Sequence, residues 1–171
     1  LVMEGTYGRN VNRYGKNIEQ EKTNFINCVR SVTDNGGKVL IPAFASGKTQ
    51  NICLLLKSMM DKKAIPEVPL KVFGMGAKIN QKYVKYKDHL SNEYDIKALS
   101  DFYSSGDEDD FASFVSSGGP AIIIATSGMV APGTFSYSFA SEIVKDEKSA
   151  IIFTGYLHRG SIGNDIRQAG Q

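Results

Sequence analysis

Three short segments of this chain combine small, polar and charged residues at places where a strand would end. They are residues 4–8, 40–50 and 155–161, which read EGTYG, LIPAFASGKTQ and GYLHRGS. Each lies at the end of a short apolar run of the kind that forms a buried strand. In an open α/β sheet the strands end along one edge, and ligands bind at that edge. The sequence therefore predicts one sheet with its functional residues gathered at the carboxyl edge.

Positively charged residues in these segments indicate a ligand that carries phosphates. Arg9 and Arg13 share a loop with Tyr7 and Tyr14, and Arg159 lies in the last of the three segments. An arginine beside aromatic rings can pair with phosphate and stack on bases. We therefore expect these loops to favour nucleic acid over a small uncharged ligand.

Three further positions each allow two interpretations. Lys48 opens a helix whose first N–H groups form a general anion site, or Ser46 simply caps that helix. His158 contacts a phosphate or a water, or it is an ordinary loop residue. Glu4 contributes to the chemistry of the edge, or its carboxylate only orders the amides of its own loop.

Two nucleotide-binding motifs are incomplete in this chain. Residues 47–49 resemble the end of a P-loop, but the glycine required five residues earlier is replaced by Pro42, which lacks an N–H and fixes φ. Residues 74–76 read GMG, but the third glycine of a dinucleotide fingerprint is replaced by Ile79. We therefore expect neither a P-loop nor a dinucleotide site.

The residues also argue against a complete catalyst within the chain. The two histidines, His89 and His158, are far apart in sequence and lack the H-x-H or H-E-x-x-H context of zinc hydrolases. No G-x-S-x-G elbow is present. The lysines at 78, 82 and 85 form a row on one helix face, which we interpret as solvated surface, with sequence-independent phosphate binding as the alternative.

Composition is that of an ordinary globular domain. The chain has 171 residues, 42% hydrophobic and 22% charged, with a net charge of +2; this length corresponds to about one domain. No apolar run approaches the roughly 18 residues of a membrane span, so no membrane partner is expected. The chain starts with Leu1 inside a strand-like run, so we expect residues 1–171 to be a single domain of a longer protein.

Apolar runs alternate with helical patterns along the chain, which predicts an α/β fold. The architecture expected is a three-layer Rossmann-like domain with a mainly parallel sheet and helices on both faces. The predicted strands are 1–3, 38–41, 70–73, 121–125 and 150–153, and the predicted helices are 16–34, 46–60, 77–90, 107–116, 133–144 and 162–167.

Within these helices, Cys28 and Cys53 lie on apolar faces. We expect both to be thiols of the core rather than a disulfide, as in a reducing compartment. In the helix at 77–90, the apolar stripe that includes Tyr83 and Tyr86 is expected to pack on the sheet.

Four segments in this order resemble the β-CASP domain, which is inserted in metallo-β-lactamase-fold nucleases such as the pre-mRNA cleavage endonuclease and its bacterial and archaeal ribonuclease relatives. They are residues 4–8, 42–50, 125–129 (ATSGM) and 153–163 (FTGYLHRGSIG). The resemblance spans nearly the whole chain.

The resemblance implies a zinc-dependent phosphodiesterase that acts on RNA, or in some members on DNA. The two zinc ions belong to the metallo-β-lactamase domain of the parent, so no cofactor is expected in this chain. Glu4 matches the acidic residue of the first family motif, in a supporting catalytic role. Lys48 stands where the family usually has an arginine. Asp165 stands where some members have a histidine that assists the active site.

The function expected is thus that of a cap domain that binds single-stranded RNA and positions it for cleavage in RNA processing or decay. The binding residues expected are Arg9, Lys48, Ser127, His158, Arg159 and Ser161. The partners expected are RNA and the metallo-β-lactamase domain, with a homo-oligomer of the parent left open. The location expected is the cytoplasm, or the nucleus in a eukaryote. The isolated chain is expected to be inactive; a non-catalytic scaffold of the same family and an unrelated nucleotide-binding domain are the alternatives.

Overall fold

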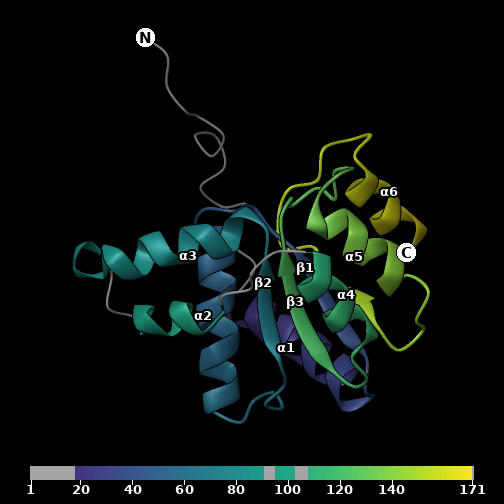
Figure 1. Ribbon diagram of the computed structural model, residues 1–171. Coiled ribbons are helices and arrows are strands. Elements are labelled where there is room, and N and C mark those ends of the chain that lie inside the picture. The colour runs from purple at the N-terminus through teal and green to yellow at the C-terminus, as the bar shows by residue number, and fades with distance from the viewer. Residues whose placement is uncertain (1–17, 91–94, 103–107, 171) are drawn as a thin grey trace.

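A four-stranded parallel sheet forms the centre of the computed structural model, which describes residues 18–90, 95–102 and 108–170 (Figure 1). The strand order is β2-β3-β1-β4. The strands are β1 (Lys38–Pro42), β2 (Leu70–Phe73), β3 (Ala121–Ala125) and β4 (Ala150–Ile151). The longest pairing joins the two inner strands, from Lys38 opposite Ala121 to Pro42 opposite Ala125.

Helices cover both faces of this sheet, which confirms the predicted three-layer α/β architecture (Figure 1). The α-helices are α1 (Ile18–Asp34), α2 (Lys48–Asp61), α3 (Met75–Lys85), α4 (Glu108–Ser116), α5 (Phe135–Ile143) and α6 (Ile162–Ala169), and two 3₁₀ segments cover Lys87–His89 and Ile96–Phe102.

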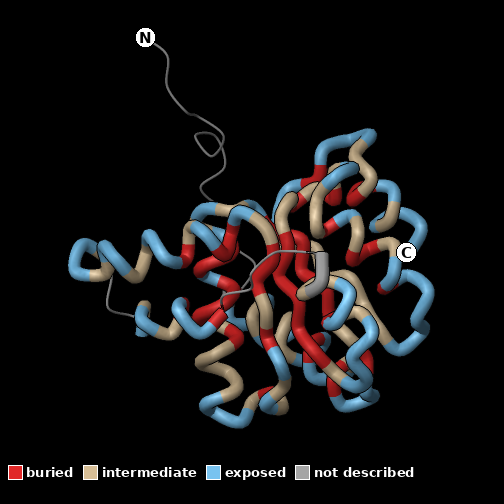
Figure 2. Tube along the Cα trace, viewed as in Figure 1, coloured by how far each residue is buried: buried red, intermediate tan, exposed pale blue. Residues whose placement is uncertain are grey.

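The two faces of the strands bury different sets of side chains, because successive strand residues point to opposite sides. Ile122 and Ile124 pack with α1 and α2 on one face. Ile123 packs with α4 and α5 on the other face. Figure 2 shows the central strands largely buried and the outer helix surfaces largely exposed. Both faces of the sheet are therefore apolar, as the continuous run at residues 121–125 predicted.

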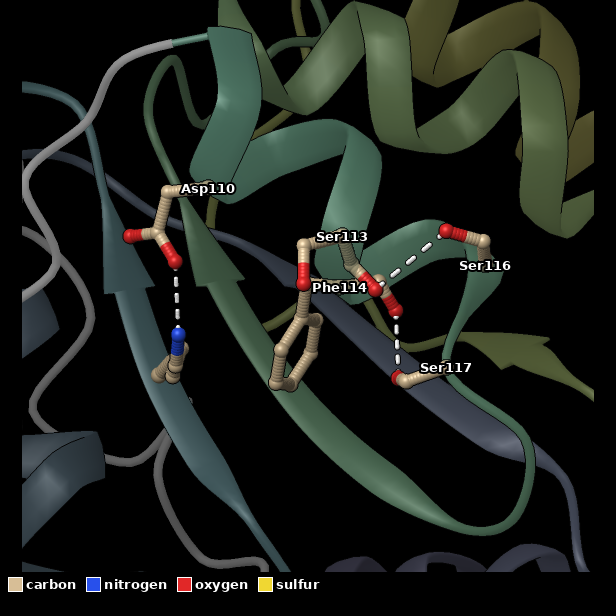
Figure 3. A network of polar contacts seen from close by, with 6 residues as sticks. Asp110, Ser113, Phe114, Ser116 and Ser117 are labelled. Atoms are coloured by element: carbon tan, nitrogen blue, oxygen red, sulfur yellow. Dashed lines mark hydrogen bonds and ion pairs between the residues drawn. The ribbon is translucent and has the colours of Figure 1, made fainter.

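On the second face, α4 is attached to β2 by an ion pair. Lys71 Nζ donates to Asp110 Oδ1 at 2.6 Å (Figure 3) and lies 5.2 Å from the centre of the Phe114 ring. The Ser117 hydroxyl donates to the Phe114 carbonyl at 2.7 Å at the end of the helix. These contacts fix α4 against the sheet but lie away from its carboxyl edge.

Several sequence predictions need correction. Cys53 is buried in the core, but Cys28 is exposed, because the helical period of α1 brings Val29 rather than its neighbour to the sheet. The two thiols are unpaired, as expected. Tyr86 does not pack on the sheet; it is 52% exposed just beyond the end of α3, at Lys85.

The buried face of α3 is formed by other residues. Gly76, Ala77 and Asn80 are its buried positions, and this part of the helix packs on the 3₁₀ segment Ile96–Phe102. The predicted strand at 1–3 lies outside the described residues. In the described ranges, none of the helices combines the length and the apolar character that crossing a bilayer requires.

Candidate functional site at the carboxyl edge of the sheet

The two inner strands leave the sheet in opposite directions. The chain after β1 enters α2 on one face, and the chain after β3 enters α5 on the other face. Since β1 and β3 are neighbours, their loops separate at the carboxyl edge. This divergence is the topological switch point where open α/β sheets bind ligands.

The loop after β1 is held by hydrogen bonds to its own helix. The Phe44 carbonyl accepts from the Thr49 N–H at 3.2 Å and from the Thr49 hydroxyl at 2.8 Å, and the Lys48 N–H donates to the Ser46 carbonyl at 2.9 Å. Gly47, with φ of 75°, precedes α2 without a side-chain cap. Ser46 therefore does not cap the helix, and the first two N–H groups of α2 are already bonded to carbonyls rather than free for an anion.

A buried polar pair supports this loop from below. Gln50 and Asn80 are each 1% exposed, and Gln50 Nε2 donates to Asn80 Oδ1 at 2.7 Å and to the Ala45 carbonyl at 3.1 Å. The bond to a carbonyl oxygen fixes which end of the Gln50 amide faces the loop. This pair connects α2, α3 and the loop that follows β1.

The loop after β3 is tied to neighbouring segments by backbone groups. The Met75 N–H donates to the Thr126 hydroxyl at 3.2 Å, and the Ala131 N–H donates to the Ser127 hydroxyl at 3.0 Å. The Gly163 N–H of α6 donates to the Met129 carbonyl at 3.0 Å. Thus the loop after β3 contacts both the start of α3 and the start of α6.

The loop after β4 ends in a capped helix. Ser161 is the N-cap of α6: its hydroxyl accepts from the Asn164 N–H at 3.3 Å and donates to the His158 carbonyl at 2.8 Å. Ser127 and Ser161, both predicted ligand residues, thus lie at the edge, and their hydroxyls already bond within the protein.

These three loops meet at the ring of Phe44. A Cβ placed on Gly128 would lie 3.1 Å from the Phe44 nitrogen and 3.2 Å from its ring, and one placed on Gly155 would lie 3.6 Å from the same ring. The ring is 43% exposed, and Tyr156, next to the second glycine, is 71% exposed. Sequence reasoning missed Phe44; the signal was a lone aromatic among small residues in a predicted edge loop.

The charge of these loops is entirely positive. Residues 43–51, 126–134 and 153–161 contain no aspartate or glutamate, although the chain has 18 of them. Their basic side chains are Lys48, His158 and Arg159, which are all exposed. Among the residues that the structure describes, none of the three side chains has a hydrogen bond or ion pair. The nearest acidic residue along the chain is Asp165, exposed in the first turn of α6.

A groove of about 900 Å³ runs beside this edge, between α1, α2 and the segment after β4. Lys48 and Gly155 line the groove at its edge end, and Phe25, Cys28 and Leu55 line its apolar part. The predicted residues Lys48, Ser127, His158, Arg159 and Ser161 therefore belong to loops that converge at the edge. Glu4 and Arg9 lie outside the described residues.

The described residues do not provide a zinc site. Within residues 18–90, 95–102 and 108–170, no three histidine, cysteine, aspartate or glutamate side chains come together as a metal site requires. Burial also raises the pKa of the Cys53 thiol to about 12, so it stays protonated at neutral pH.

Comparison with known proteins agrees with this geometry. The family model described as the Beta-Casp domain matches residues 49–166. A transcription termination factor FttA of Thermococcus kodakarensis is 32% identical over 177 residues, covering 98% of this chain and 27% of that protein. The FttA of a Lokiarchaeum species is 31% identical over 174 residues, covering 97% of this chain and 27% of that protein.

A further relative has a different name. An RNase J-like protein of Methanocaldococcus jannaschii is 28% identical over 171 residues, covering 98% of this chain and 39% of that protein. The chain thus spans between about a quarter and two fifths of the length of these relatives.

Proposed function

This chain belongs to the β-CASP family, and from that premise we propose that it is the nucleic-acid-binding domain of a longer ribonuclease. In this proposal the carboxyl-edge loops hold single-stranded RNA and position it for cleavage in RNA processing or decay. RNA is chosen because the relatives are named as a transcription termination factor and an RNase J-like protein. Membership of the family removes the reason to consider an unrelated nucleotide-binding domain.

One observation supports the proposal most directly: the three edge loops contain cations and no carboxylate. Exposed Lys48 and Arg159 side chains without partners favour a polyanion, and neighbouring aromatic rings favour a single strand with accessible bases. Phosphate contacts of this kind fix the register of a strand. Fixing the register is what a positioning domain must do.

Cleavage belongs to a metallo-β-lactamase domain of the parent, whose zinc would supply an activated water for hydrolysis. Because the described residues do not form a zinc site, the 171-residue chain alone should cleave no RNA. Metal-dependent cleavage by the purified chain would overturn this division of roles. We also propose a cytoplasmic location, in keeping with the two unpaired thiols.

The test is a titration of labelled 15-nucleotide RNA, followed by anisotropy at several salt concentrations. The double variant Lys48→Gln, Arg159→Gln should bind several-fold more weakly. Each phosphate contact with a single strand contributes about 0.7 to the slope of log K against log salt, so loss of two contacts should flatten it by about 1.4.

The matched control is Lys145→Gln, Lys148→Gln, which removes the same charge from the opposite edge of the sheet, near Gly37 at the start of β1. This variant should keep the slope and affinity of the unmodified chain. Equal weakening by both variants would mean that general charge, and not the carboxyl edge, attracts RNA. No salt-sensitive binding by the unmodified chain would contradict the proposal and favour a scaffold role.

A further inference from the structure

The position of the Phe44 ring at the carboxyl edge indicates a more specific contact with a ligand than the positive charge of the edge does. The other phenylalanines of this domain are buried or half-buried; Phe73 is 0% exposed and Phe139 is 1% exposed. Phe44 is 43% exposed, although it lies only two residues after β1, whose last four residues are buried. The exposure therefore results from the position that the loop gives to this residue.

The backbone at Phe44 has little freedom to withdraw the ring. Its carbonyl oxygen accepts two hydrogen bonds from Thr49, and the preceding residue, Ala43, donates its N–H to the Ala125 carbonyl at 3.0 Å. The following carbonyl, that of Ala45, is bonded to buried Gln50. The ring is thus presented by a backbone that is fixed on both sides.

Two glycines, Gly128 and Gly155, pack beside the Phe44 ring. Ideal Cβ positions on Gly128 and Gly155 both lie within 4 Å of the Cδ2 and Cε2 atoms of Phe44, and the one on Gly128 is nearer still to the Phe44 nitrogen. Because neither glycine has a side chain, the loops after β3 and β4 support this side of the ring without covering it. The remaining part of the ring stays open to a ligand.

The surroundings indicate which ligand. Lys48, the first residue of α2, lies four positions after Phe44 and lines the same groove as Gly155. Tyr156 adds a second exposed ring on the neighbouring loop. A flat apolar surface beside unpaired cations complements a nucleobase attached to phosphates, and such stacking is tolerant of base identity.

We infer that Phe44 is a stacking platform for one base of the bound strand. This inference rests on the proposed function, since it names the part of the RNA that the carboxyl edge holds. Phe44 is then a positioning residue: it fixes one nucleotide by its base, while Lys48 and Arg159 hold phosphates on either side.

The chain contains no tryptophan, so the variant Phe44→Trp introduces a single indole whose fluorescence reports on this position alone. Titration with 15-nucleotide RNA should quench that fluorescence, with the same midpoint as the anisotropy of labelled RNA. Inorganic polyphosphate should compete for binding but cause no quenching, because it carries no bases.

A second variant tests the contribution to affinity. Phe44→Leu keeps an apolar side chain on the two glycines but removes the aromatic face, and it should weaken RNA binding by roughly 5- to 150-fold, the range for one stacked base. Tyr86→Leu, which removes an equally exposed ring at the far end of α3, should leave affinity unchanged. Thermal unfolding of each variant shows whether the fold is intact.

The outcomes distinguish a failure of the stacking platform from a failure of the proposed function. RNA binding by anisotropy without quenching, together with unchanged affinity of Phe44→Leu, would overturn the stacking platform and leave the proposed function standing. Loss of RNA binding by the unmodified chain would overturn the proposed function itself. Quenching of the same size by polyphosphate would also overturn the inference, since the signal would then not depend on a base.

Discussion

The packing of Phe44 can be tested by two glycine-to-alanine substitutions that differ in how close the added methyl group comes to Phe44. Gly128→Ala places a methyl group 3.1 Å from the Phe44 nitrogen and 3.2 Å from its ring, whereas Gly155→Ala places one 3.6 Å from that ring. A separation of 3.6 Å is ordinary van der Waals contact. At 3.1 Å the neighbour must move by a few tenths of an ångström.

The atom that would have to move is backbone, which sets the size of the effect. Phe44 is fixed by the two bonds from Thr49, so relief requires a shift of the loop and not of a side chain alone. Overpacking of this kind costs about 1–3 kcal/mol. For a domain of this size each kcal/mol lowers the melting temperature by about 2–4 °C, so Gly128→Ala should melt about 2–12 °C lower.

Gly155→Ala should be neutral or slightly stabilising, because an alanine restricts the unfolded chain without a clash in the folded one. The assay is thermal and urea unfolding of both variants and the unmodified chain, followed by RNA titration. Gly128→Ala should also bind RNA more weakly, since the ring is displaced from its seat. Equal melting temperatures for the two variants would refute the proposed packing of Phe44 on Gly128.

Three further predictions concern the buried Gln50 amide and the two thiols. Gln50→Leu removes the donor to the Ala45 carbonyl and to Asn80 Oδ1 and leaves both acceptors unpaired. It should lower the free energy of unfolding, measured in urea, by about 1–3 kcal/mol. The control Asn51→Ala, at an exposed neighbouring position, should change this free energy little. At pH 8 a maleimide should label Cys28 alone, and both thiols should react in urea. Burial raises the pKa of Cys53 from 9.0 to about 12, so its contribution to the free energy of unfolding is complete below pH 9 and is lost as the pH rises toward 12. The loss should reach about 1.4 kcal/mol per pH unit. Cys53→Ala should lack this loss, and identical pH profiles for the variant and the unmodified chain would contradict the prediction.

The layers of the fold could be predicted because the strands are short and strongly apolar. The run at residues 121–125 indicated a strand buried on both faces, and its bounds agree with β3. The strand at 150–153 was predicted too long, because β4 pairs at Ala150 and Ile151 alone and the chain then bends toward the edge, with the Ile152 N–H still bonded to the Leu40 carbonyl. Apolar content does not reveal where pairing stops.

The errors within helices have a common cause. Sequence periodicity predicts an apolar stripe but not which other element it meets. The stripe of α3 was assigned to the sheet, yet the helix packs largely on the 3₁₀ segment Ile96–Phe102, and the small residues Gly76 and Ala77 allow this approach. Asn80 is buried there because Gln50, thirty positions earlier, supplies its partner. A contact between distant polar residues leaves no local signal.

The sequence predicted where the site residues lie better than it predicted what each residue does. The edge segments were recognised from their composition, since glycine, serine and threonine after an apolar run are typical of strand-to-helix turns. Ser127 and Ser161 were predicted to bind nucleic acid through the amides near them, a prediction that stays untested; their hydroxyls accept from the Ala131 and Asn164 N–H groups and stabilise the loops. Residue type alone does not distinguish a hydroxyl that binds a ligand from one that closes a turn.

This division among the polar groups has a consequence for how RNA would be read. The hydroxyls of Thr49, Thr126, Ser127 and Ser161 all bond to backbone groups inside the edge. The groups that face outward are cations and aromatic rings, which recognise phosphates and the flat faces of bases. Reading base identity needs hydrogen-bond groups directed at base edges, and these four hydroxyls are bonded within the structure of the loops. If the proposed function holds, we therefore expect RNA binding by this domain to depend little on the base sequence of the strand.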